Sequence, residues 1–126
     1  MTIDAIREYC LAKPGKVTEG LPFGDDVVVF KANMKIFLLM PLDVHPQSLS
    51  VKCDPGLAVE LREKYEAVQP GYHLNKKHWN TIVLDGTVPT REIRAMIDRS
   101  FELVAGSSSR RSPDRQQKKK RRRTEA

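Results

Sequence analysis

Residues 70–82 read PGYHLNKKHWNTI, and this stretch is the most informative part of the chain for both fold and function. It contains the only tryptophan, two of the three histidines, two asparagines and an adjacent pair of lysines. It has no carboxylate, and the next one is Asp85. Side chains of these types suit contact with an anion such as a phosphate. Pro70-Gly71 at the start of the stretch breaks the preceding element, and the residues from Trp79 onward predict a strand.

The remaining elements follow from apolar periodicity and from turn residues. Helices are predicted over residues 3–13, 55–65 and 91–104, each preceded by a capping Thr or Asp. Strands are predicted over residues 27–31, 35–40, 48–53 and 79–84, and Asn33 joins the first two as a hairpin. This order predicts an α+β domain over residues 1–105, in which helices cover one face of a mainly antiparallel sheet.

The composition changes sharply after residue 105. Of the 22 basic and 16 acidic residues of the chain, nine and two lie in residues 106–126, which gives this segment a charge of +7. The remaining 13 and 14 give residues 1–105 a charge of −1, so the net +6 belongs to the tail. Because residues 106–126 contain no apolar side chain larger than alanine apart from Pro113, they predict a disordered tail. Its cationic run consists of Lys118, Lys119, Lys120, Arg121, Arg122 and Arg123.

Several classes of protein do not fit the sequence. No apolar run approaches the eighteen or so residues that a membrane span requires, and the N-terminus lacks the pattern of a signal peptide. Cys10 and Cys53 do not form a disulfide framework or a Cys-x-x-Cys motif. We therefore expect a cytoplasmic protein with reduced thiols, monomeric and without a membrane partner.

Three blocks of sequence, in order, carry a resemblance to a known family. They are LPFGD at residues 21–25, VKCDP at 51–55, and PGYHLNKKHWNT at 70–81 followed by LDG at 84–86. With them, residues 1–105 resemble the MmcQ/YjbR family of small bacterial proteins. The resemblance implies a frataxin-like, or CyaY-like, fold with N- and C-terminal helices. It also implies DNA binding, the label that members commonly carry, with a winged arrangement proposed. The basic tail is not part of the family pattern.

The stretch at 70–82 supports two interpretations. In the first it is a nucleic-acid contact surface, where lysines meet phosphates, asparagines bond phosphate, sugar or base edges, and Tyr72 or Trp79 stacks on a base. The candidate residues are His73, Asn75, Lys76, Lys77, His78 and Asn80. In the second, which we favour for Trp79, the tryptophan is a core residue, the asparagines hold a turn and the lysines keep it solvated.

Metal binding and catalysis find little support. His73 and His78 have a spacing used in zinc sites, but only His45 and Cys53 could complete four ligands, so no metal or cofactor is expected. Cys53 could act as a nucleophile with a histidine, but the neighbouring Asp54 carboxylate opposes a thiolate. No phosphate loop, nucleophile elbow or His-Glu-x-x-His motif is present. We expect a protein that is not an enzyme.

The sequence thus predicts a protein that binds nucleic acid, DNA rather than RNA, with sequence-independent phosphate contacts from the tail. If all six cations of the run met phosphates, affinity would fall with salt at a log–log slope of about −5. The alternative is a module that binds a protein or a small anion through residues 73–80. A pocket formed by His73, Asn75, His78 and Asn80 would favour this alternative.

Overall fold

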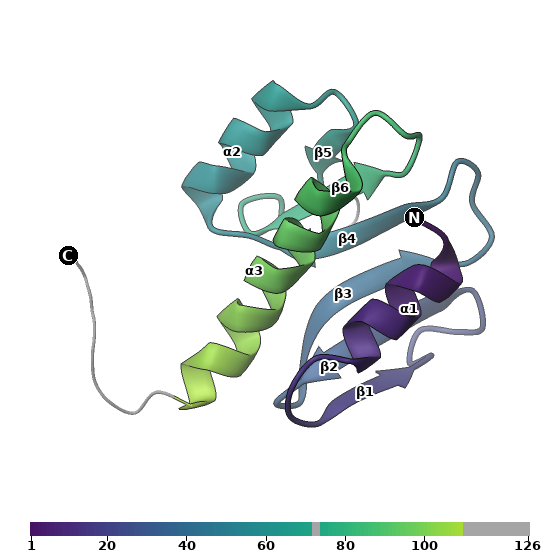
Figure 1. Cartoon of the computed structure of the whole chain (residues 1–126), viewed down its shortest axis with the longest axis vertical. Coiled ribbons are helices and arrows are strands. Elements are labelled where there is room, and N and C mark those ends of the chain that lie inside the picture. The colour runs from purple at the N-terminus through teal and green to yellow at the C-terminus, as the bar shows by residue number, and fades with distance from the viewer. Residues whose placement is uncertain (72–73, 110–126) are drawn as a thin grey trace.

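In the computed structural model, which describes residues 1–71 and 74–109, the chain forms a six-stranded antiparallel sheet and three helices (Figure 1). The helices are α1 (Ile3–Leu11), α2 (Pro55–Lys64) and α3 (Thr90–Ser109). The strands are β1 (Val17–Gly20), β2 (Val27–Ala32), β3 (Lys35–Pro41), β4 (Ser48–Lys52), β5 (Val68–Pro70) and β6 (Trp79–Val83). Their order across the sheet is β1-β2-β3-β4-β6-β5, and every neighbouring pair is antiparallel. The predicted α+β class is confirmed.

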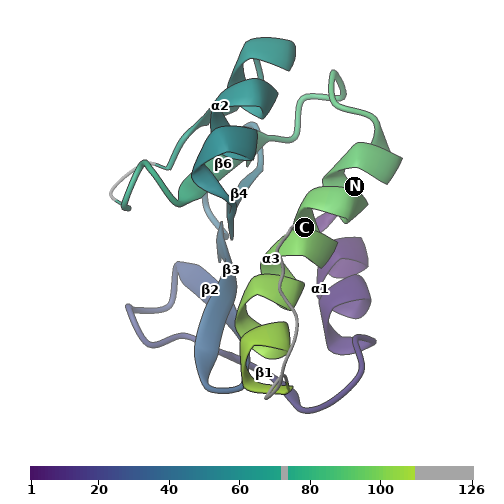
Figure 2. The same ribbon diagram turned by 90° about the vertical axis from the view of Figure 1, so that its left-hand side faces the viewer.

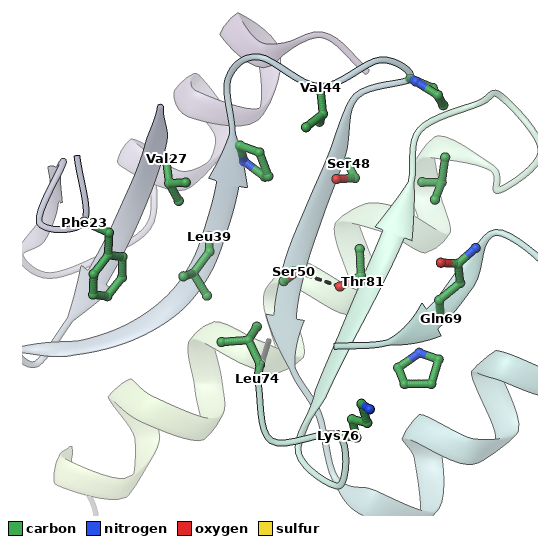
Figure 3. Close-up of a pocket in the computed structure, with 14 residues that line it drawn as sticks. Phe23, Val27, Leu39, Val44, Ser48, Ser50, Gln69, Leu74, Lys76 and Thr81 are labelled. Atoms are coloured by element: carbon green, nitrogen blue, oxygen red, sulfur yellow. Dashed lines mark hydrogen bonds between the residues drawn. The ribbon is translucent and has the colours of Figure 1, made fainter. Parts of the chain in front are cut away.

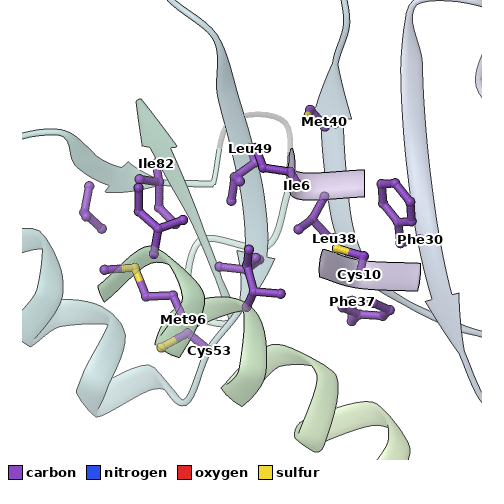
Figure 4. Packing of buried hydrophobic residues seen from close by; sticks show 14 of the residues in the cluster. Ile6, Cys10, Phe30, Phe37, Leu38, Met40, Leu49, Cys53, Ile82 and Met96 are labelled. Carbon is purple, nitrogen blue, oxygen red and sulfur yellow. The ribbon is translucent and has the colours of Figure 1, made fainter. Parts of the chain in front are cut away.

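The helices cover one face of the sheet, and α1 and α3 lie side by side on it (Figure 2). Alternation along the strands directs apolar side chains to this face, as Leu49 and Val51 of β4 illustrate. Phe37 meets Phe101 of α3 edge to face, with ring centroids 5.5 Å apart. The buried cluster joins all three helices to the sheet and includes Ile6, Cys10, Phe30, Leu38, Met40, Cys53, Ile82 and Met96 (Figure 4).

The buried hydroxyl of Ser100 connects α3 to the sheet through two hydrogen bonds. It donates to the carbonyl oxygen of Phe37 at 2.5 Å and accepts from the backbone N–H of Lys52 at 2.8 Å. These two bonds satisfy backbone groups of β3 and β4 where the two strands diverge. The C-terminal half of α3 is thereby fixed against the middle of the sheet.

The two edge strands were not predicted from the sequence. Both are short, and each mixes one apolar residue with polar ones, so no clear alternation marks them. Pro70 can close β5 because an edge strand tolerates a residue that has no N–H. The last helix also differs from its prediction, since it runs to Ser109 rather than to residue 104.

Trp79 is not a core residue, so the prediction that placed it in the core is wrong. On β6 the side chains of Asn80 and Ile82 point toward the helices and are buried. Successive strand residues face opposite ways, so Trp79 lies on the face away from the helices, where it is half-buried. Gly71 allows β5 to reach this residue, since a Cβ on Gly71 would lie 2.7 Å from the Cβ of Trp79.

Candidate nucleic-acid interface

Residues 74–78 form a turn that exposes its two lysines. The Oδ1 of Asn75 accepts from the backbone N–H of Lys77 at 2.9 Å, and the N–H of His78 donates to the carbonyl of Asn75 at 3.1 Å. The N–H of Cys53 donates to the carbonyl of His78 at 2.7 Å, which ties the turn to the end of β4. Asn75 therefore stabilises the turn through the backbone, while Lys76, Lys77 and His78 stay exposed.

Asn80 does not belong to this surface. Its side chain is 1% exposed, accepts from the Nε of Arg62 at 2.8 Å and donates to the carbonyl of Ala58 at 3.3 Å. Arg62 also donates through a second guanidinium nitrogen to the carbonyl of Lys76. The prediction that Asn80 contacts nucleic acid is therefore wrong, because its side chain is buried and bonded to Arg62 and Ala58. Its role is to position Arg62. Through Arg62 it fixes the backbone of the turn against α2.

Other predicted residues lie outside the described part of the chain. These are His73 and the tail residues Lys118, Lys119, Lys120, Arg121, Arg122 and Arg123. The described candidate pocket residues of the 73–80 segment, Asn75, His78 and Asn80, do not form a common pocket. Asn75 bonds its own turn, and Asn80 faces α2.

The strand register shows at which end of the sheet each connecting segment lies, together with the strand residues next to it. At one end, which we call the lysine end, lie residues 12–16, 31–35, 52–54 and 74–78. These described segments contain Lys13, Lys16, Lys31, Lys35, Lys52, Lys76 and Lys77. Asp54 is the one carboxylate within them, and it caps α2 by accepting from two backbone N–H groups. The net charge of −1 on residues 1–105 therefore conceals a strongly basic end.

The opposite end, the carboxylate end, comprises residues 21–26, 42–47, 65–67 and 84–89. These segments carry Asp25, Asp26, Asp43, Glu66 and Asp85, and within them no lysine or arginine occurs. The segments at the two ends thus carry opposite charge. Such a separation creates a field that orients an approaching polyanion toward the lysine end.

Part of the exposed surface at the lysine end lies at the tip of the β2–β3 hairpin and beside it. Lys16 and Lys35 are exposed, and Met34 at the tip is 91% exposed. Lys13 is instead engaged with Asp98 of α3. The C-terminal end of α3 lies at the same end of the sheet as this hairpin tip (Figures 1 and 2). The basic tail therefore continues the chain from the end that already holds the lysines.

The described residues offer little to a metal ion or to covalent catalysis. Within residues 1–71 and 74–109, no group of three or more His, Cys, Asp or Glu side chains could hold a metal ion. Burial raises the pKa of Cys53, and the Asp54 carboxylate raises it further, so the thiol form is favoured. Burial also raises the pKa of Cys10, to about 12. In the same part of the chain, no helix is long and apolar enough to cross a membrane.

The fold and the charged end define a class of small α+β domain in which three helices cover one face of an antiparallel sheet. A model of the YjbR family matches residues 11–103, and the chain belongs to that family. The chain is 33% identical to the uncharacterized protein YjbR of Escherichia coli K12, over 81% of this chain and 86% of that protein. It is 46% identical to the uncharacterized protein YyaQ of Bacillus subtilis, over 44% of this chain and 46% of that protein.

Solved structures agree with this membership. The crystal structure of Deinococcus radiodurans protein DR2400, described with the domain DUF419, matches with a TM-score of 0.80 and 38% identity. That match covers 85% of this chain and 80% of the other. A Pseudomonas syringae protein matches with a TM-score of 0.71 and 27% identity, over 82% and 99% of the two chains. The resemblance to the MmcQ/YjbR proteins is confirmed.

Lys16, Lys31 and Lys35 were not identified from the sequence as candidate binding residues. They are spread over two segments, and none of them stands beside another lysine. Only the register, which pairs Thr18 with Lys31 and Val17 with Ala32, brings them to one end of the sheet. A weak signal was present, because Lys31 and Lys35 flank the predicted turn at Asn33.

Proposed function

We propose that this protein binds nucleic acid without catalysing a reaction, with DNA as the first ligand to test, through the lysine end and the basic tail together. The sorting of charge by strand register is the observation that carries the proposal. Ammonium groups on several loops can meet successive phosphates, which fixes a protein on a duplex without reading its sequence.

The contacts at the turn support this role. Lys76 and Lys77 are exposed on a backbone held by Arg62, Asn75 and Cys53, so the backbone that carries them is fixed before a ligand arrives. Groups positioned in advance lose less conformational entropy when they bind. Met34 adds an exposed apolar side chain at the hairpin tip, of a type that can wedge between base steps in a minor groove.

The test compares, in the full chain, two lysines of the lysine end with an arginine near the carboxylate end. In fluorescence anisotropy with two duplexes of unrelated sequence, Lys76→Ala with Lys77→Ala should weaken binding equally for both duplexes. Arg91→Ala removes one exposed positive charge from the start of α3, near the carboxylate end, and should leave affinity nearly unchanged. A loss of log affinity from Arg91→Ala that is half that of the double lysine variant, the same loss per charge removed, would show that only net charge matters and would refute a specific basic end.

A further inference from the structure

The face of the sheet away from the helices carries a groove that the nucleic-acid proposal does not use. Its volume is about 840 Å³, and its floor is formed by residues of β2, β3, β4 and β6 (Figure 3). Phe23, Val44 and Leu74 border it from three different loops. This volume lies in the range of pockets that hold small organic molecules.

The floor of the groove is unusually apolar for a sheet face without a covering layer. An antiparallel sheet that faces water normally presents polar side chains on that face. Here Val27, Leu39 and Val83 face outward from three strands. At the centre, the hydroxyls of Ser50 and Thr81 bond each other at 2.8 Å. Most of the groove therefore offers contact to a hydrocarbon rather than to water.

One charged group stands at the border of this apolar surface. Among the described residues that line the groove, Lys76 is the only one with a charged side chain. Its carbonyl is held by Arg62, so the ammonium group extends from a fixed backbone. The carboxylates of the β1–β2 and β3–β4 loops lie at the opposite end of the sheet. An anionic group is therefore attracted to one end of the groove and repelled from the other.

We propose that the groove binds a small amphipathic acid, with its hydrocarbon part over Val27, Leu39 and Val83 and its carboxylate at Lys76. The basic tail is a poor occupant, because residues 106–126 contain no apolar side chain larger than alanine apart from Pro113. The hollow between three loops also fits a compact ligand better than the flat surface of another sheet. The site lies on the face of the sheet and shares only Leu74 and Lys76 of the 74–78 segment with the proposed nucleic-acid interface.

Decanoate titrated into the ¹⁵N-labelled full chain is a direct probe of this site. Amide signals of residues such as Leu39, Ser50 and Leu74 should shift together and saturate. Decanol and decylamine have the same number of carbon atoms and one more methylene in the alkyl chain, and should still bind more weakly because they lack the carboxylate. Each methylene added to the acid and buried should improve affinity up to about fourfold. Absence of saturable shifts at about 1 mM decanoate, or shifts confined to other faces, would overturn the proposal.

Matched variants separate this site from unspecific binding. Leu39→Asp places a carboxylate in the groove and should weaken decanoate binding by more than about tenfold, since it removes apolar contact and repels the ligand. Leu103→Asp makes the same change at an exposed leucine of α3 outside the groove and should have no effect. Lys76→Ala should weaken binding by up to about fivefold, whereas Lys77→Ala should not.

Two further outcomes would contradict the proposed ligand or its orientation in the groove. Equal affinity of decanoate and decanol, or equal effects of the two lysine variants, would refute the assignment of the carboxylate to Lys76. Concentration-dependent shifts of the groove residues without any probe would show that a second copy of the chain occupies the groove instead. Because nucleic-acid binding is measured separately, failure of one proposal leaves the other intact.

Discussion

At the scale of the single residue, Met34 has a backbone conformation that glycine adopts more easily. Its φ is +64° and that of Asn33 is +55°, the positive pair that a tight two-residue hairpin turn requires. Asparagine tolerates this region well, whereas a methionine there is strained. The side chain itself is 91% exposed and makes little compensating contact.

Met34→Gly should therefore stabilise the domain by about 1 kcal/mol, because it removes the strain of the left-handed conformation. Met34→Ala keeps the strain and removes the side chain, so it should leave stability unchanged within about 0.5 kcal/mol. Urea denaturation of both variants measures the difference. Stabilisation by alanine as large as by glycine would mean that the side chain, not the backbone, carries the cost.

At the scale of the element, the turn at residues 74–78 depends on α2. The sequence predicted that asparagines hold this turn, and for Asn75 this is confirmed by its bond to the N–H of Lys77. The part played by Asn80 could not be predicted. Its partners Arg62 and Ala58 are 18 and 22 residues away, and only the packing of α2 on β6 brings them together.

Asn80→Ala should destabilise the protein by about 1–3 kcal/mol, since the carbonyl of Ala58 and the Nε–H of Arg62 lose a buried partner. The amide signals of Lys76 and Lys77 should broaden or shift, because Arg62 no longer fixes the turn. Asn75→Ala, at an exposed position, should cost less than about 1 kcal/mol. An Asn80→Ala variant with unchanged stability and unchanged amide signals would contradict this positioning role.

The helices and the inner strands could be predicted from the sequence, whereas the edge strands β1 and β5 could not. The helix starts at Thr2 and Asp54 could be predicted because capping and periodicity are local. The strands β1 and β5 form where neighbouring strands offer unpaired backbone groups, and this depends on the finished sheet. Trp79 was misplaced for a related reason. The sequence of β6 does not reveal that the polar Asn80 takes the inward position.

At the scale of the whole molecule, the distribution of charge matters more than its sum. The sequence alone gives residues 1–105 a charge of −1, which argues against a polyanion partner for that part of the chain. Strand register removes this argument, since it collects lysines at one end of the sheet and carboxylates at the other. No local pattern of residues could have predicted this separation, because it follows from the order of all six strands.

The most direct test of the proposed function is the salt dependence of duplex binding by the full chain with Lys118–Arg123 replaced by glutamines. Without those six cations, we assign the remaining phosphate contacts to the lysine end and to the three arginines of residues 110–117. We predict residual binding at low salt, and a log–log slope that Lys76→Ala with Lys77→Ala makes shallower by about 2. An unchanged slope, or no binding by the glutamine variant at low salt, would contradict a nucleic-acid interface at the lysine end.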